Sequence, residues 1–192
     1  MKVSVFGSAH PKPGDTEYLE AYRLGKCLAE RGYIVLNGGY VGTMEAVSKG
    51  TAEAGGHVIG VTCDDIERWR NDKPNPWVHE VMHHTDLFGR ISGLVRNCDA
   101  AIALPGGVGT LAEIALTWNM IILESIPVPY LLLVGEGWKR VMTTFFDEMP
   151  CFVPTSVREY IRFCLNIEEA VAQLDNFYVE KMRKHGERKT NP

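Results

Sequence analysis

The sequence predicts an α/β protein with a Rossmann-like, three-layer α/β/α fold around a mostly parallel central sheet. Short apolar runs alternate along the chain with amphipathic stretches of helical length, which is the pattern of strands and helices in turn. Strands that alternate with helices form parallel sheets covered on both faces. Glycine-bearing turns follow three of the apolar runs. In such sheets, ligands bind at the carboxyl ends of the strands, where these turns lie.

The N-terminal half begins with an apolar strand at Lys2–Phe6, followed by a Pro/Gly segment. Asp15 or Thr16 can cap the next helix, and Gly32 is placed to end it. A long polar loop at 63–78 is a candidate lid, because long loops in compact domains are often functional. The other elements expected here are a strand at Tyr33–Leu36, a helix at about Thr43–Ala54, a strand at Val58–Val61 and a short strand at His79–His84.

A chain of 192 residues fits one domain with a full core. We expect residues 1–180 to form this single domain and the charged residues 181–192 to be a frayed tail. The elements expected in the C-terminal half are a helix at Leu87–Asn97, a strand at Ala100–Leu104, a helix that reaches Leu123, a strand at Pro129–Val134, a helix at Trp138–Met149, a strand at Tyr160–Cys164 and a last helix from about Ile167.

Composition excludes several classes of protein. A formal net charge of −4 argues against a nucleic-acid-binding surface, which needs a basic face. The sequence contains no apolar run long enough to span a bilayer, and its N-terminus resembles a strand more than a signal peptide. The five cysteines are widely scattered, and none of them form a C-x-x-C pair. We therefore expect reduced thiols in a soluble, cytoplasmic protein.

The segment Pro105–Glu113, with sequence PGGVGTLAE, is the most informative motif. It lies between an apolar strand and an amphipathic helix. A helix start presents unpaired N–H groups and a partial positive charge, which attract phosphate. Gly106, Gly107 and Gly109 let the backbone approach an anion closely. The segment therefore predicts a phosphate site with the hydroxyl of Thr110 and the carboxylate of Glu113 beside it.

A simpler interpretation of this motif remains open. Thr110 and Glu113 also have the spacing of a capping box, in which Glu113 would bind the N–H of Thr110. The two residues share one helix face with Thr117, so this polar stripe is either a pocket wall or a solvated edge. The apolar side of the same helix is expected to carry Leu111, Ile114, Ala115, Trp118 and Ile122.

Two further segments are candidates for the same site. The turn Gly38–Gly42 is a weak signal alone, but it is a second glycine turn in the same sheet, and Gly7-Ser8 is a third. Arg90 lies in a predicted helix. It is either a surface residue or a residue whose guanidinium binds a phosphate or carboxylate through two N–H groups. Gly93, in the middle of that helix, suggests close approach of a ligand or another helix.

A metal site is not expected. His83 and His84 are adjacent on a predicted strand, so their side chains point to opposite faces. The sequence contains no Cys/His cluster with zinc spacing, and Asp64-Asp65 is interpreted as a solvated part of the loop.

The motif P-G-G-x-G-T-x-x-E, preceded by G-G-x-x-G-x-M-x-A at Gly38–Ala46, is similar to that of the LOG (LONELY GUY) family, formerly labelled lysine decarboxylases. The resemblance runs from about Val3 to Val134. The chain departs from the usual pattern at Ile91, at Ala112 and at Glu45, and its 63–78 segment is closer to a bacterial branch than to the plant enzymes.

The resemblance implies a nucleotide-binding, Rossmann-like fold and a homodimer or larger homo-oligomer. It also implies a phosphoribohydrolase that cleaves nucleoside 5′-monophosphates, such as AMP or cytokinin nucleotides, to free base and ribose 5-phosphate without a metal or redox cofactor. Glu113 and Arg90 match the family's catalytic pair. The residues expected to bind the nucleotide are Gly106, Gly107, Val108, Gly109, Thr110, Gly38, Gly39, Gly42, Ser8 and Met44.

Some relatives imply an alternative, a non-catalytic carrier of a nucleotide or of a phosphorylated cofactor such as the molybdenum cofactor. In such a carrier, Glu113 would only cap its helix. We reject lysine decarboxylation, because Lys26 and Lys49 lie in predicted helices with no pattern that supports a pyridoxal phosphate site.

Overall fold

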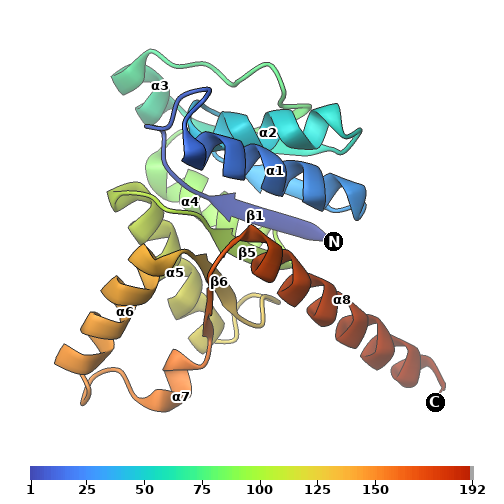
Figure 1. Cartoon of the computed structure of the whole chain (residues 1–192), viewed down its shortest axis with the longest axis vertical. Coiled ribbons are helices and arrows are strands. Elements are labelled where there is room, and N and C mark those ends of the chain that lie inside the picture. Colours follow the sequence, from blue (N-terminus) through green and yellow to red (C-terminus); the bar gives the residue numbers. More distant parts are fainter. Residues whose placement is uncertain (191–192) are drawn as a thin grey trace.

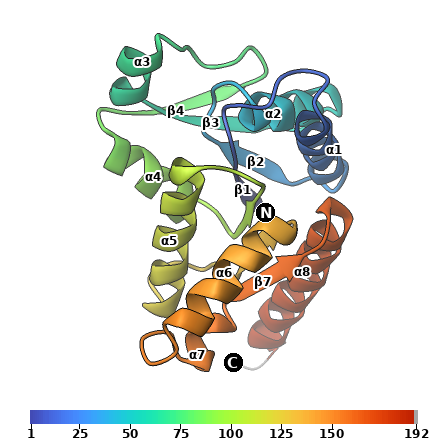
Figure 2. The same cartoon turned by 60° about the vertical axis from the view of Figure 1, so that its left-hand side comes forward.

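The computed structural model describes the backbone of residues 1–190 and the side chains of residues 1–179 and 183. It confirms the predicted α/β fold. All seven strands run parallel in one sheet, in the order β4-β3-β2-β1-β5-β6-β7, with helices on both faces (Figures 1 and 2). The strands are β1 (Lys2–Phe6), β2 (Ile34–Asn37), β3 (Val58–Cys63), β4 (Glu80–His84), β5 (Ala100–Ala103), β6 (Leu131–Val134) and β7 (Ile161–Cys164).

Every pair of consecutive strands is connected through at least one helix, as parallel strands require, and the last helix follows β7. Figure 2 shows α1 and α8 to the right of the sheet, with α4 and α5 to its left. The helices are α1 (Thr16–Glu30), α2 (Thr43–Glu53), α3 (Asp64–Arg70), α4 (Leu87–Arg96), α5 (Val108–Ile122), α6 (Glu136–Glu148), α7 (Thr155–Arg158) and α8 (Ile167–Thr190).

The core is split by the sheet into two apolar layers. Side chains alternate between the faces of a strand, so Val3 and Val5 of β1 pack in one layer with α1, α2 and α8. Phe6 packs in the other layer with residues of α4, α5 and α6. Because both faces are covered, strands β2, β3, β5 and β6 are nearly or entirely buried along their length.

The order of the strands reverses beside β1. The chain runs outward from β1 to β4 at one edge, and then returns to place β5 on the other side of β1. The helices that follow β1 and β5 therefore diverge, which leaves a crevice at the carboxyl ends of the two strands. The predicted glycine motifs follow β1, β2 and β5, so all of them lie at this edge.

One predicted element is wrong. The first part of the predicted 63–78 loop is the helix α3, which carries three acidic residues in its first turn and Arg68 and Arg70 in its last. Charges in this arrangement stabilise a helix through its dipole. The rest of the segment, from Asn71, is irregular, and it is fixed by Asn75, whose buried amide donates to the carbonyls of Gly39 and Tyr40 at 3.0 and 2.9 Å.

The other predicted elements match the structure within a few residues, whereas the short helix α7 was not predicted. Asp15 precedes α1 as its N-cap, but its carboxylate binds the N–H of Lys12 at 2.8 Å and caps no helical N–H. Gly32 ends α1 with a φ of +71°.

None of the helices within the described residues is long and apolar enough to cross a bilayer. Most of the tail predicted at 181–192 lies outside the described side chains, so its boundary at residue 180 stays a prediction.

Candidate functional site

A cavity of about 510 Å³ lies at the carboxyl ends of the strands, beside β1. It is lined by the turns after β1 and β2 and by residues of α2, α3, α4 and α5. This volume lies within the range of small-ligand sites. Its position is the one that the reversal in strand order favours.

Glu113 and Arg90 meet in the wall of this cavity. Oε1 of Glu113 lies 3.5 Å from Nη1 of Arg90, and both side chains are more than nine-tenths buried. Burial raises the pKa of Glu113 from its ordinary value near 4.5 to about 7, although the positive charge of Arg90 acts in the opposite direction. A carboxyl group with this pKa exists in both protonation states near neutral pH, which suits proton transfer.

The rest of the Arg90 side chain is held by groups from three other elements. Its Nε donates to the carbonyl of Val61 in β3 at 2.9 Å. Its guanidinium lies over the ring of Tyr40, at 5.7 Å from the centroid, and Nη2 lies 3.9 Å from the sulfur of Met44. Because these contacts fix the guanidinium, Nη1 is directed at Glu113. Arg90 is therefore a buried site residue, and its interpretation as a surface arginine is wrong.

The start of α5 borders the same cavity. Gly107 is the N-cap, with no side-chain cap, so the first N–H groups of the helix have no partner within it. Gly107, Val108, Gly109 and Thr110 all line the cavity. A helix start in this position is a ready anion site.

The capping-box interpretation of this helix is wrong. The box requires Thr110 at the N-cap, whereas Thr110 is the third residue of α5. The carboxylate of Glu113 instead faces Arg90. The polar stripe is a pocket wall at Thr110 and Glu113, while Thr117 is buried and its hydroxyl donates to the carbonyl of Glu113 at 2.7 Å.

Glycine is required where the wall is tightest. A Cβ added to Gly38 would lie 1.9 Å from Nη2 of Arg90, and one added to Gly106 would lie 2.1 Å from Oγ1 of Thr110. Gly42 has a φ of +74°, and a Cβ there would lie 2.3 Å from the carbonyl oxygen of Ser8. These glycines let the three turns and the arginine pack against one another.

Gly93 has a different role from the one considered in the sequence. A Cβ there would lie 2.6 Å from Nε2 of His84 and 3.1 Å from Cγ1 of Val61. Gly93 therefore lets α4 approach β3 and β4, and the nearest atoms belong to these strands and not to a second helix. His84 points to the opposite side of β4 from His83, as expected for neighbours on a strand.

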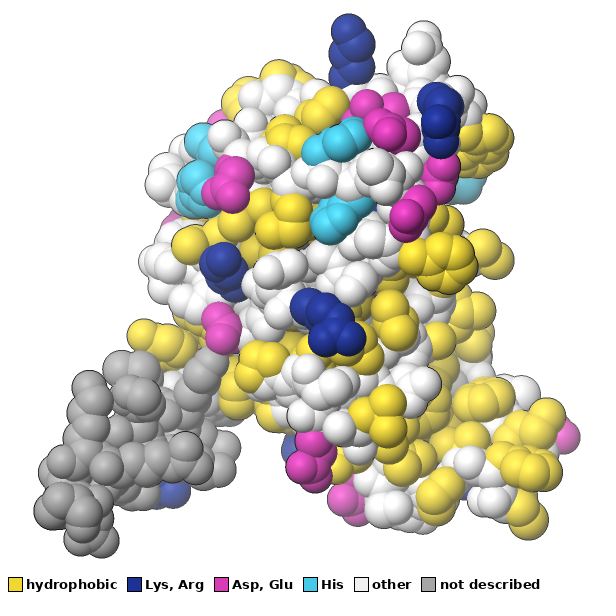
Figure 3. All heavy atoms as spheres, turned by 180° about the vertical axis from the view of Figure 1, so that it is seen from behind, with side chains coloured by type: hydrophobic (Ala, Val, Ile, Leu, Met, Phe, Trp, Pro, Cys, Tyr) yellow, Lys and Arg dark blue, Asp and Glu magenta, His cyan; other side chains and the backbone are white. Residues whose placement is uncertain are grey.

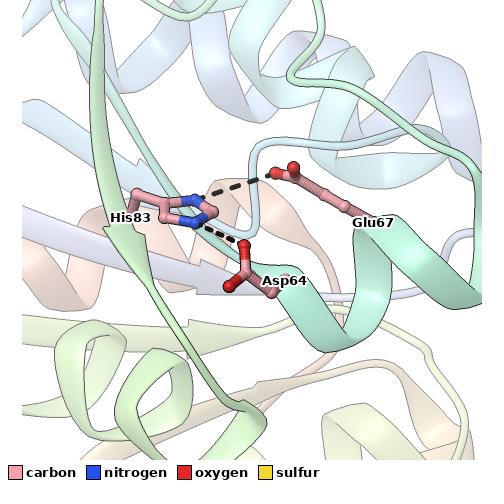
Figure 4. A group of neighbouring side chains, drawn as sticks. All are labelled: Asp64, Glu67 and His83. Carbon is pink, nitrogen blue, oxygen red and sulfur yellow. Dashed lines mark hydrogen bonds and ion pairs between the residues drawn. The ribbon is translucent and has the colours of Figure 1, made fainter.

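A second polar cluster lies beneath α3 and is shown in Figure 4. Nε2 of His83 is 2.8 Å from Oδ1 of Asp64, while Nδ1 is 2.9 Å from the hydroxyl of Thr62 and 3.9 Å from Oε1 of Glu67. The ligand atoms of the His and the two acids lie within 4.8 Å of one another. Since each ring nitrogen already faces its own oxygen, we interpret the cluster as an anchor between α3 and β4. Asp64 is therefore part of an ordered helix and not of a solvated loop.

Comparisons with known proteins agree with the motifs. The SLOG cluster4 family model matches residues 1–125. A cytokinin riboside 5′-monophosphate phosphoribohydrolase of Arabidopsis thaliana, LOG7, is 33% identical over 186 residues, which cover 93% of this chain and 83% of that protein. The chain belongs to the LOG family. A probable enzyme of the same name from Oryza sativa, LOGL5, is 32% identical over 82% of this chain, which spans 61% of that relative.

Solved structures support the LOG-family fold. A molybdenum cofactor binding protein from Rippkaea orientalis superposes with a TM-score of 0.73 at 22% identity, covering 92% of this chain and 96% of the other. The molybdenum cofactor carrier protein of Chlamydomonas reinhardtii has a TM-score of 0.69 at 22% identity, covering 93% and 98%. At this identity, the likeness shows the fold alone.

The residues that match the LOG-family motifs come together in space. The predicted residues that line the cavity are Ser8, Gly38, Met44, Arg90, Gly107, Val108, Gly109, Thr110 and Glu113. Gly39, Gly42 and Gly106 instead shape the turns behind this lining. The prediction missed Tyr40, which supports Arg90, and the α3 residues at the cavity, which are Asp65, Ile66, Trp69 and Arg70.

Proposed function

We propose that this protein is a phosphoribohydrolase that cleaves the N-glycosidic bond of a nucleoside 5′-monophosphate, such as AMP or a cytokinin nucleotide. One observation carries the proposal: a buried carboxyl group with a pKa of about 7 faces a cavity beside the start of a helix. The names of the relatives in Arabidopsis and rice support the same reaction.

The start of α5 binds the 5′-phosphate in this proposal. The N–H groups of Gly107–Thr110 and the hydroxyl of Thr110 are the donors, and the helix dipole adds a partial positive charge. Glu113 follows one turn later on the same helix. One turn of helix rises about 5.4 Å, which is a suitable separation between a bound phosphate and a carboxylate beside C1′ of the ribose.

Cleavage breaks the bond between C1′ and the base nitrogen, and the base leaves with the electron pair and gains a proton. Positive charge develops on the ribose as the bond lengthens. The ionised carboxylate of Glu113 stabilises this charge and accepts a proton from the water that adds to C1′, and this proton balances the one that the base gains, so Glu113 ends the reaction ionised again. Arg90 orients the carboxylate through Nη1 and favours its ionised form. The products are the free base and ribose 5-phosphate.

The test is incubation of the purified protein with AMP, followed by measurement of adenine and ribose 5-phosphate. Glu113→Gln is expected to lose at least about a hundredfold in turnover while it still binds AMP, because it cannot accept a proton. Glu20→Gln is a matched control, because Glu20 is an exposed carboxylate on α1. Full activity in the Glu113→Gln protein would overturn its assigned role.

A non-catalytic carrier of a nucleotide or phosphorylated cofactor is the second candidate. It is favoured by the solved structures with this fold, of which one is named a molybdenum cofactor binding protein and another a molybdenum cofactor carrier protein. The same helix start would bind the phosphate, and Glu113 with Arg90 would only close the wall. Tight binding of a phosphorylated ligand, with no turnover across a panel of nucleoside monophosphates, would favour the carrier.

We also propose that the protein is a homodimer or a larger homo-oligomer. Large apolar side chains are exposed along α5 and continue onto α6, and Figure 3 shows hydrophobic side chains gathered over this part of the molecule. Exposed apolar patches of this kind mark interfaces. The residues concerned are Val108, Leu111, Leu116 and Ile122 on α5 and Leu123 directly after it, with Val141, Phe145 and Met149 on or beside α6.

The proposed location is the cytoplasm. All five cysteines are free thiols, and three of them, Cys63, Cys98 and Cys164, are buried. Free thiols persist in a reducing compartment. The proposed substrate, a nucleoside monophosphate, suits the same compartment.

A further inference from the structure

The helix α3 carries an exposed tryptophan at the cavity. Asp65, Ile66, Trp69 and Arg70 of this helix all line it. The side chain of Trp69 is 77% exposed, although an indole is one of the largest apolar groups, and Arg70 lies 5.0 Å from its ring centroid. An exposed indole beside an open cavity is a surface on which a flat ligand can stack.

Several contacts hold α3 in this position. His83 of β4 binds Asp64 and faces Glu67 (Figure 4), and the hydroxyl of Tyr40 lies 3.3 Å from Oε1 of Glu67. Oδ2 of Asp65 accepts from the N–H of Leu87, the first residue of α4, at 3.0 Å. The short helix is therefore tied to β4, to the β2–α2 turn and to α4, so its cavity-facing side chains have a fixed direction.

An apolar wall connects Arg90 to Trp69. Leu87 and Ile91 lie on the same helix as Arg90 and line the cavity beside it. Ile66 and Trp69 continue this wall on α3, across the bond between Asp65 and Leu87. The turn after β1 adds Ser8, Ala9 and His10 to the lining, and the ring of His10 is 3.1 Å from the hydroxyl of Ser8. The broad apolar surface is therefore on the side of α3 and α4.

We propose that α3 is the base-recognition element and that the base of the nucleotide stacks on the indole of Trp69. The inference rests on the proposed function, which places the phosphate at the start of α5 and C1′ beside Glu113. The base then extends from Glu113 past Arg90 to the wall formed by Ile66, Leu87, Ile91 and Trp69. Because a purine offers a larger flat surface than a pyrimidine, AMP is preferred over CMP.

Calorimetry with AMP, CMP and ribose 5-phosphate tests the inference. Trp69→Ala is expected to weaken AMP binding at least about tenfold, and CMP binding less, because stacking on an aromatic ring is lost. Ribose 5-phosphate has no base, so its affinity stays within about twofold of wild type. Trp69→Phe is expected to recover most of the affinity for AMP. Since Trp69 is mostly exposed, its replacement leaves the thermal midpoint nearly unchanged.

Phe152→Ala is the matched control, because Phe152 is an equally exposed aromatic residue outside the cavity lining, and it is expected to bind AMP like wild type. If the Trp69→Ala protein binds AMP as tightly as the Phe152→Ala protein, the inference is wrong. If Trp69→Ala weakens ribose 5-phosphate as much as AMP, Trp69 shapes the cavity and does not bind the base.

The hydrolase proposal and the base-stacking proposal can be overturned independently of each other. AMP that binds through Trp69 and is never cleaved contradicts the hydrolase and supports base stacking. AMP that is cleaved with an unchanged KM in the Trp69→Ala protein contradicts stacking and supports the hydrolase. Absence of AMP binding to the wild-type protein overturns the inference.

Discussion

Burial and the guanidinium of Arg90 act on Glu113 in opposite directions, and burial has the larger effect. A carboxylate beside a cation usually has a lowered pKa, whereas that of Glu113 is raised to about 7. Its ionised form is therefore costly in the folded protein near neutral pH. Active sites often contain charges of this kind, because an unfavourable charge in the free protein is relieved when positive charge develops on the substrate.

The raised pKa makes stability depend on pH. In the unfolded chain Glu113 ionises near 4.5, and in the folded protein near 7. Between these values the folded state retains a proton that the unfolded state has lost, so this contribution to stability falls as pH rises from about 4.5 to 7. Above about pH 7, Glu113 is ionised in both the folded and the unfolded state, and its contribution to stability no longer changes with pH.

Glu113→Gln removes this pH dependence, because glutamine does not ionise. Relative to wild type, the free energy of unfolding of the variant is expected to rise by about 2–3 kcal/mol between pH 5 and pH 8. The free-energy cost of leaving Arg90 without its partner is nearly independent of pH over this range. It therefore does not change how the difference in unfolding free energy between variant and wild type depends on pH. Urea unfolding at several pH values measures the difference. A difference that stays constant with pH would contradict the raised pKa.

Gly38→Ala tests the position of Arg90. The new Cβ would lie 1.9 Å from Nη2 of Arg90 and 2.4 Å from the sulfur of Met44. The guanidinium must therefore shift from its position against Glu113, and we expect kcat for AMP to fall at least about tenfold. Gly137→Ala is the control, because a Cβ there meets no atom within 4 Å. A Gly38→Ala protein with wild-type kcat would show that this geometry is not needed.

At the scale of elements, Gly93 determines how closely α4 packs on the sheet. Gly93→Ala is expected to destabilise the fold by about 1–3 kcal/mol, because the methyl group would lie 2.6 Å from Nε2 of His84. In a protein that already carries His84→Ala, the same substitution is expected to cost clearly less, since the closest atom is gone. Thermal or urea unfolding of the four proteins measures this coupling. Additive effects would exclude the contact as the cause.

The helix α3 shows what the sequence could not predict. Its seven residues are too few to display a helical period, none of them is buried, and prolines follow at 74 and 76. These features favour a loop. The helix depends on distant contacts, such as that of His83 with Asp64, and such contacts cannot be read from neighbouring residues. Trp69 was therefore not predicted to line a cavity.

The sheet and the glycine motifs could be predicted, because each depends on a local pattern. Alternating apolar runs predict strands and helices, and the segment 105–113 predicts a helix start beside a strand. The meeting of Arg90 with Glu113 depends on how α4 packs against α5, and only the family resemblance pointed to the pair. Tyr40 was missed because an aromatic residue in a glycine turn carries no signal that it will support an arginine.

At the scale of the whole molecule, the exposed apolar surface of α5 and α6 predicts self-association. We expect sedimentation velocity to show a dimer or larger oligomer. The double substitution Leu111→Glu and Ile122→Glu is expected to shift it to the monomer, because charges placed in an apolar interface lose hydration. Leu165→Glu is the control, since Leu165 is exposed but lies between β7 and α8. A wild-type protein that sediments as a monomer would contradict the proposed homo-oligomer.

The reversal of strand order beside β1 also has a consequence for how the two parts of the chain cooperate. Gly38 and Met44 belong to the part that runs from β1 to β4, whereas Glu113 belongs to the part that begins at β5, and α4 with Arg90 is the connection between them. The cavity is lined by residues of both parts, so a ligand that occupies it would connect them across the middle of the sheet. Ligand binding should then slow hydrogen exchange in β2 as well as in β5, although only the turns beyond these strands touch the ligand.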